Sequence, residues 1–223
     1  MKKVIIVAPH PDDETLGCGG TILKHIDKGD EVFWLVMTTI KGSPNFSKQE
    51  INKRESEITS VGRKYGFKGI IKSDFISSQL DTYPKQSIIK FISSKFNKIK
   101  PNIVYAPFEN DAHSDHKEIF KATIACCKSF RYPFISSVRV YETLSETGLN
   151  LSAKNISFNP NLWIDISDYL EKKIEIMNYY KGEVGEHPFP RSNESIRALA
   201  TLRGSSVSVK YAEAFISLKE VIV

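Results

Sequence analysis

The sequence predicts an α/β fold, a single Rossmann-like domain with a mainly parallel sheet flanked by helices. Short apolar runs that are typical of buried strands alternate with longer segments whose apolar residues recur at helical spacing. This repeated β-α-β order makes neighbouring strands parallel and places helices on the faces of one sheet. The 223 residues are enough for one sizeable core, and the sequence contains no repeat or linker. We therefore expect a single domain over residues 1–223.

The first half of the chain alternates strand and helix three times. Strands are expected at 4–8, 32–38 and 70–71, and helices from about 15 to 29, 47 to 66 and 84 to 101. The first helix carries Gly19 and Gly20 on its apolar face, which would let it lie close to the sheet. Ser47 and Glu50 form a capping box at the start of the second helix, and Gly66 ends that helix.

The second half continues the pattern less regularly. A strand is expected at 103–108, a helix from about 114, a strand at 138–141, an apolar segment at 162–166, helices at about 168–180 and 193–203, and a final strand near 212–218. In open sheets of this kind, ligands bind beyond the carboxyl ends of the strands. The loops that follow the first and fourth strands are therefore the expected place for a site.

Composition and charge exclude several classes of protein. No stretch approaches the roughly 20 apolar residues of a membrane span. The apolar run after Lys3 is too short for a signal peptide, so we expect a cytoplasmic protein. The net charge of +5 is spread along the chain, and no nucleic-acid partner is expected. The cysteines Cys18, Cys126 and Cys127 form no C-x-x-C pair, so neither a disulfide framework nor a cysteine zinc site is indicated.

The two loops at the expected ligand edge hold metal-ligating residue types. The first loop reads Ala8-Pro9-His10-Pro11-Asp12-Asp13-Glu14, and the second reads Asn110-Asp111-Ala112-His113-Ser114-Asp115-His116. His10 and Asp13 are three residues apart at a strand-to-helix turn, and His113 and His116 are three apart entering a helix, so each pair can face one point. Zinc hydrolases use three such ligands and keep a fourth position open for water. Either loop alone would more often be a helix cap or exposed histidines; together they indicate a metal site.

The first loop resembles the A-H-P-D-D-E signature, and the second the H-x-D-H signature, of the LmbE-like or PIG-L-type N-acetylglucosaminyl deacetylases. Pro9 is a compatible variation, and Ser114 stands where the family often has proline, which should not affect ligation. The resemblance continues over most of the chain, in Arg54-Glu55-Ser56-Glu57, Ser78-Gln79-Leu80-Asp81, Tyr141-Glu142-Thr143, Arg203-Gly204 and Tyr211-Ala212-Glu213-Ala214-Phe215.

The resemblance implies a zinc-dependent N-deacetylase with one zinc ion per chain. It implies that His10, Asp13 and His116 are the zinc ligands, that Asp12 is the general base, and that His113 stabilises or protonates the tetrahedral intermediate. This division suits amide hydrolysis, which needs a polarised carbonyl, an activated water and a group facing the oxyanion.

Two further residues have open roles. Arg54 resembles a substrate-binding arginine of the family, and a guanidinium would suit sugar hydroxyls or phosphate, but it could equally be a helix-surface charge. Asp115 either orients His113 or His116 or only caps the start of its helix.

The expected substrate is a small N-acetylated amino sugar, and the sequence leaves open whether it is linked to a nucleotide or a lipid and whether the chain forms a homo-oligomer. The pocket should be built from residues 40–47, 141–147 and 182–191. The nearest alternative is the same chemistry on another N-acyl substrate, such as a thiol-cofactor precursor, an antibiotic sugar or a chitooligosaccharide. Metal-dependent phosphoester hydrolysis ranks lower because a two-metal clamp needs more bridging carboxylates. A non-catalytic sugar-binding protein would not need Asp12 beside its metal.

Overall fold

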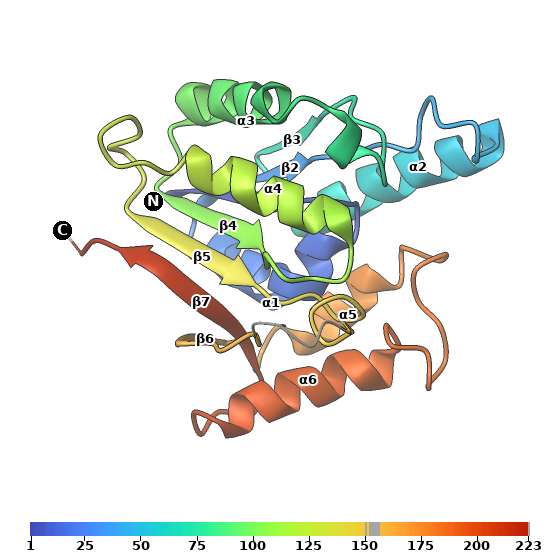
Figure 1. The fold of residues 1–223 in the computed structure, drawn as a ribbon. Coiled ribbons are helices and arrows are strands. Elements are labelled where there is room, and N and C mark those ends of the chain that lie inside the picture. The colour runs from blue at the N-terminus through green and yellow to red at the C-terminus, as the bar shows by residue number, and fades with distance from the viewer. Residues whose placement is uncertain (150, 152–156, 223) are drawn as a thin grey trace.

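The computed structural model describes residues 1–149, 151 and 157–222 and contains one seven-stranded sheet (Figure 1). The strand order is β3-β2-β1-β4-β5-β7-β6, and all pairs from β3 to β5 are parallel. β7 runs antiparallel to both β5 and β6. The strands are β1 (Lys3–Ala8), β2 (Glu31–Val36), β3 (Gly69–Lys72), β4 (Ile103–Pro107), β5 (Ser137–Tyr141), β6 (Leu162–Asp165) and β7 (Ala212–Glu220). The predicted α/β fold with a mainly parallel sheet is confirmed.

Helices cover both faces of this sheet. They are α1 (Asp13–Asp27), α2 (Lys48–Tyr65), α3 (Lys85–Ile99), α4 (Ser114–Ala125), α5 (Leu170–Met177) and α6 (Asn193–Ser205), with a short 3₁₀ helix η1 at Leu80–Thr82 that the sequence did not predict. The capping box of α2 is present, with Ser47 and Glu50 bonded to each other's backbone N–H groups. Gly66 ends α2 in the left-handed conformation that a glycine adopts without strain.

The residues of β1 alternate between two hydrophobic cores, one on each face of the sheet. Val4, Ile6 and Ala8 pack with apolar residues of α1, α2, α5 and α6, whereas Ile5 and Val7 pack with residues of α3 and α4. Figure 1 shows this layering, with α3 and α4 on one side of the strands and α1, α5 and α6 on the other. Because both faces are covered, β1 is apolar throughout its buried part.

The glycines of α1 allow the close approach that the sequence indicated. A Cβ atom at Gly19 would lie 2.7 Å from Lys173 Cγ, and one at Gly20 would lie 2.6 Å from Ile166 Cγ2. Gly17 shows the same constraint, since its Cβ would lie 2.3 Å from the Tyr141 ring. The backbone of α1 is thereby held against β5 and α5, which fixes where its first residue, Asp13, is placed.

The structure corrects some element boundaries. α1 begins at Asp13 rather than at about residue 15, so Asp13 and Glu14 belong to its first turn. α5 ends at Met177, three residues before its expected end. Within the described residues, no helix combines the length and the apolar character that crossing a membrane requires.

Candidate metal centre and its pocket

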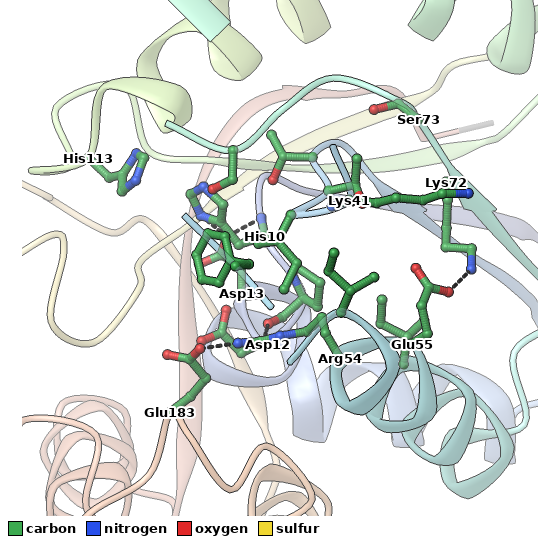
Figure 2. Close-up of a pocket in the computed structure, with 18 of the residues that line it drawn as sticks. His10, Asp12, Asp13, Lys41, Arg54, Glu55, Lys72, Ser73, His113 and Glu183 are labelled. Atoms are coloured by element: carbon green, nitrogen blue, oxygen red, sulfur yellow. Dashed lines mark hydrogen bonds and ion pairs between the residues drawn. The ribbon is translucent and has the colours of Figure 1, made fainter. Parts of the chain in front are cut away.

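A cavity of about 540 Å³ opens beside the loop that follows β1 (Figure 2). Its lining includes residues from all three segments in which the sequence placed the pocket: Ile40, Lys41 and Phe46; Thr143, Ser145 and Glu146; Glu183 and Arg191. His10, Asp12, Asp13, His113 and Arg54 also line it. The predicted location of the site, beyond the ends of the parallel strands, agrees with this cavity.

His10, Asp13 and His116 bring three ligand-type atoms together at the cavity. Asp13 Oδ2 lies 3.4 Å from His10 Nδ1 and 3.3 Å from His116 Nε2. A tetrahedral ion with bonds of about 2.0–2.1 Å has its ligand atoms roughly 3.3 Å apart, so these separations suit one small cation. His10 follows β1, Asp13 opens α1, and His116 lies in the first turn of α4. Two loops that lie far apart in the sequence thus meet at one point.

A carboxylate orients each of the two imidazole rings. His10 Nε2 lies 3.0 Å from Asp115 Oδ2, and His116 Nδ1 lies 2.7 Å from Asp111 Oδ2. These contacts direct the other nitrogen of each ring toward Asp13. His116 Nε2 is buried and has no hydrogen-bond partner among the described residues. A carboxylate behind each histidine and a buried ring nitrogen facing the cluster are what a metal site requires.

Opposite charges dominate the electrostatics of this cluster. Burial opposes the charged form of His10, but hydrogen bonds to Asp115 and Asp13 outweigh it and raise the pKa of His10 to about 9. Burial likewise opposes charge on His116, yet Asp13 and Asp111 raise its pKa well above the usual value. Burial opposes ionisation of Asp13 too, but the two histidines lower its pKa. The carboxylates therefore stabilise positive charge here, and a metal cation that binds would displace the histidine protons.

A second group, His10, His113 and Asp115, also has ligand-type atoms within 4.8 Å of one another. It suits a cation less well because more of its acceptor atoms have backbone partners: in the first group, among the described residues, only Asp13 Oδ2 has one, the N–H of His10 at 2.8 Å. Asp115 Oδ2 accepts a hydrogen bond from Ser78 N at 2.7 Å, and its Oδ1 accepts one from Leu80 N at 3.2 Å. His113 Nδ1 accepts one from Asp115 N at 3.1 Å. The group containing Asp13 and His116 is the better metal site.

The position of Asp115 departs from both sequence expectations. Its carboxylate contacts His10, while its nearest approach to a His113 ring nitrogen is 3.9 Å. The carboxylate behind His116 belongs to Asp111, which was not among the predicted site residues. The N-cap of α4 is His113, whose side chain accepts from Asp115 N. Asp115 thus orients His10 rather than His113 or His116, the two histidines that the sequence suggested.

Asp12 has a strained backbone and a side chain that pairs with an arginine. Its φ of 132° lies in a region that residues with a Cβ rarely adopt. Its N–H donates to Glu14 Oε2 at 3.0 Å, and its Oδ2 accepts from Arg191 Nη1 at 2.8 Å. Burial, followed by the charges of Asp13 and Glu183, raises the pKa of Asp12 well above its usual value. The carboxylate lines the cavity beside the metal cluster and is not one of its three converging groups.

His113 is held as a neutral ring. Because its Nδ1 accepts from Asp115 N, Nε2 carries the hydrogen in the neutral form. Burial and then the charge of His10 lower the pKa of His113 to about 4. Its ring packs edge-on against His10 with centroids 4.4 Å apart. In the view of Figure 2, His10 and Asp13 lie between His113 and Asp12.

Arg54 lines the cavity from α2 and is not a solvated surface charge. Its Nη1 donates to Pro11 O at 3.1 Å, and its Nη2 forms an ion pair with Glu183. Glu183 also accepts from Arg191 Nη1 at 3.0 Å. Sequence reasoning assigned no role to Glu183 or Arg191. Their signal in the sequence was their place in the segment expected to line the pocket.

The chain is similar to known proteins in sequence and in fold. The diacetylchitobiose deacetylase of Thermococcus kodakarensis is 27% identical over 221 residues, which cover 96% of this chain and 82% of that protein. A conserved protein of Thermus thermophilus superposes with a TM-score of 0.79 at 24% identity, covering 100% of this chain and 97% of the other. The N,N'-diacetylchitobiose deacetylase of Pyrococcus horikoshii superposes with a TM-score of 0.78 at 24% identity, covering 98% and 84% of the two chains.

The family assignment comes from a match to a family model. The model described as PIG-L, GlcNAc-PI de-N-acetylase, matches residues 5–127, which is more than half of the 223 residues. The matched region contains both loops of the metal cluster, most of β1 and the strands β2, β3 and β4. This chain belongs to the PIG-L family.

Proposed function

We propose that this protein is a zinc-dependent hydrolase that removes the acetyl group from the nitrogen of an amino sugar, releasing acetate and a free amine. The observation that carries the proposal is the convergence of His10, Asp13 and His116 on one point of a cavity that Asp12 and His113 also line. The family assignment supports this reaction, as do relatives named "Diacetylchitobiose deacetylase" and "Probable N-acetyl-alpha-D-glucosaminyl L-malate deacetylase 2".

His10, Asp13 and His116 would hold one zinc ion per chain. When bound, zinc polarises a carbonyl oxygen and lowers the pKa of a coordinated water to about 7. Two imidazole nitrogens and one carboxylate oxygen form a donor set that suits this ion and leaves a position open. Asp111 and Asp115 would keep the two rings oriented, with contacts of 2.7 and 3.0 Å.

Asp12 would act as the general base. Its carboxylate lines the cavity next to Asp13 and can accept the proton of the water that attacks the amide carbonyl. The raised pKa that burial gives Asp12 suits it to hold that proton and to return it to the amine as the carbon–nitrogen bond breaks. The proton taken from water thereby leaves on the amine, and the hydroxyl oxygen leaves in acetate.

His113 would stabilise the oxyanion as a neutral hydrogen-bond donor. The sequence left two roles for it, stabilisation or protonation. The bond from Asp115 N to its Nδ1 leaves Nε2 to carry the hydrogen, so the neutral ring can donate from that atom. With a pKa of about 4, the ring does not supply a proton at neutral pH. This division of labour gives the proton transfer to Asp12 and the charge stabilisation to His113.

The cavity and the relatives support an amino sugar as the substrate class. A cavity of about 540 Å³ with both charged and apolar lining residues can hold a sugar together with a second group. Arg54 would contact the substrate only through donors not used by Pro11 and Glu183. A linked nucleotide or lipid is not required by these contacts. The same chemistry on a different N-acyl compound is the alternative.

Acetate release tests the proposal. The zinc-loaded protein is incubated with N-acetylglucosamine, diacetylchitobiose, N-acetylglucosaminyl malate and UDP-N-acetylglucosamine, and both acetate and free amine are measured. We expect equal amounts of acetate and amine from at least one sugar and none after chelation. Release of phosphate from a phosphoester panel, or substrate binding without turnover by zinc-loaded protein, would contradict the proposal.

A further inference from the structure

We propose that Arg191, held by Glu183, is a positioning residue for Asp12. This inference rests on the proposed function, because it concerns the residue that would act as the base. Arg191 and Glu183 lie in the segment before α6, far from Asp12 in the sequence. All three residues line the cavity, where Arg191 contacts Asp12. Neither residue belongs to the metal cluster.

Asp12 needs external support because its backbone is strained. The backbone of Asp12 has a φ of 132° and a ψ of −30°. Its N–H does not take part in a helix or strand and donates instead to Glu14 Oε2. Glu14 is itself fixed by Tyr180 OH at 2.8 Å and Thr15 Oγ1 at 2.6 Å. Strained conformations persist only where the surroundings impose them. Glu14 fixes the backbone of Asp12, which leaves the orientation of the carboxylate to be fixed by another group.

Arg191 is the group that fixes this carboxylate. Its Nη1 donates to Asp12 Oδ2 at 2.8 Å and to Glu183 Oε2 at 3.0 Å. The side chain of Asp12 is only 5% exposed, so an unpaired charge there would be costly. Oδ2 of Asp12 is therefore committed to Arg191, and the residue still lines the cavity.

Glu183 links this contact to a second arginine. Its Oε1 pairs with Arg54 Nη2, and Arg54 Nη1 donates to the carbonyl of Pro11 at 3.1 Å. The two arginines thus hold adjacent residues of the loop, one through the backbone of Pro11 and the other through the side chain of Asp12. Figure 2 shows Arg54, Asp12 and Glu183 gathered on one side of the cavity. Glu183 pairs one carboxylate oxygen with each guanidinium group and so links the two arginines.

The contacts favour positioning over substrate binding for Arg191. Its Nη1 is used twice within the protein and its Nε is buried, so of the three guanidinium nitrogens only Nη2 is left to meet a ligand in the cavity. A residue that positions the base should affect turnover, whereas one that holds substrate should affect KM.

Variants at positions 183 and 191 test the inference. Arg191→Met should lower kcat about 10- to 100-fold with KM within about twofold of wild type and zinc content unchanged, because a misplaced base costs rate and not affinity. Arg191→Lys should recover part of the loss, and added guanidinium ion should partly restore Arg191→Met. Glu183→Gln should show a smaller loss of the same kind. Glu186→Gln, an exposed residue of the same segment, and Arg197→Met, in an exposed ion pair on α6, are the matched controls and should match wild type.

A crystal structure of Arg191→Met separates failure of this inference from failure of the proposed function. We expect the Asp12 carboxylate to adopt a different orientation while His10, Asp13 and His116 stay in place. If wild type releases no acetate, the proposed function fails, and the orientation of Asp12 still tests the positioning role. An unchanged Asp12 in Arg191→Met, unchanged kcat, or a raised KM with unchanged kcat would each overturn the inference.

Discussion

The loops after β1 and β4 and the segment before α6 line the same cavity, but they depend on the rest of the fold in different ways. His10 and Asp13, like His113 and His116, are three residues apart, so each pair is brought to one place by a single turn of chain. Arg191 reaches Asp12 across 179 residues, and Glu183 reaches Arg54 across 129. Each of these two pairs is thus set by local geometry and the fold has only to bring the two loops together, whereas the contacts that Arg191 and Glu183 make depend entirely on the complete fold.

The largest effect should come from the metal cluster itself. His116→Ala removes one of the three proposed ligands, so zinc content should fall from one per chain to near zero and acetate release to background. His25→Gln is the control, because His25 lies outside the cavity and contacts Asp30 and Tyr105. Zinc content is measured by elemental analysis after dialysis. A His116→Ala protein that retained full zinc would show that the ligand assignment is wrong.

Removal of the base should separate chemistry from metal binding. Asp12→Asn keeps the shape of the side chain but cannot accept the water proton, so turnover should fall about 10²- to 10⁴-fold. Steady-state kinetics and elemental analysis check this, and zinc content and KM should stay near those of wild type. Loss of zinc in this variant would mean that Asp12, not Asp13, contacts the ion.

Variants of His113 test whether this residue donates a hydrogen bond as a neutral ring or supplies a proton. His113→Ala should lower turnover about 10²- to 10³-fold by removing an oxyanion donor, and His113→Gln should recover part of it because an amide N–H can donate. The pKa of His113 is lowered to about 4, so the ring is already neutral near pH 7 and cannot give rise to an alkaline limb. The alkaline limb of the pH–rate profile should therefore persist in His113→Ala. If the alkaline limb disappeared in His113→Ala, His113 would be the proton donor instead.

The carboxylate behind His116 should have a more moderate effect. Asp111→Asn keeps a hydrogen bond to His116 but removes the charge that orients and polarises the ring, so zinc affinity should fall about 10- to 100-fold. Competition with a chelator measures this affinity. Asp81→Asn, which changes a carboxylate of η1 outside the cavity lining, is the control. Equal zinc affinities in the two variants would remove Asp111 from the metal site.

The smallest expected effect concerns the packing that places α1. A Cβ at position 17 would lie 2.3 Å from the Tyr141 ring, so Gly17→Ala should lower the free energy of unfolding by about 1–3 kcal/mol. At Gly148 a Cβ would meet nothing within 4 Å, and Gly148→Ala should leave stability nearly unchanged. Denaturant unfolding of both variants checks this. Equal stabilities would mean that α1 shifts freely against β5.

The sequence predicted most of the fold because its signals are local. Alternating apolar runs, the Ser47–Glu50 capping box and Gly66 each fix an element from a few neighbouring residues, and the structure has them all. The antiparallel placement of β7 between β5 and β6 depends on long-range pairing, which a local sequence pattern does not predict. The same limit applies to the site. His10 and Asp13 could be paired from spacing, but the contact between Asp115 and His10 joins residues 105 positions apart.

The position of a bound zinc ion tests the account most directly. Crystals of the zinc-loaded protein, measured at the zinc absorption edge, should give one anomalous peak per chain, bonded to His10 Nδ1, Asp13 Oδ2 and His116 Nε2. Zinc bound at the second group, formed by His10, His113 and Asp115, would be the contrary result. A peak bonded to His113 and Asp115 instead, or no peak in protein that hydrolyses the substrate, would contradict the proposed metal centre.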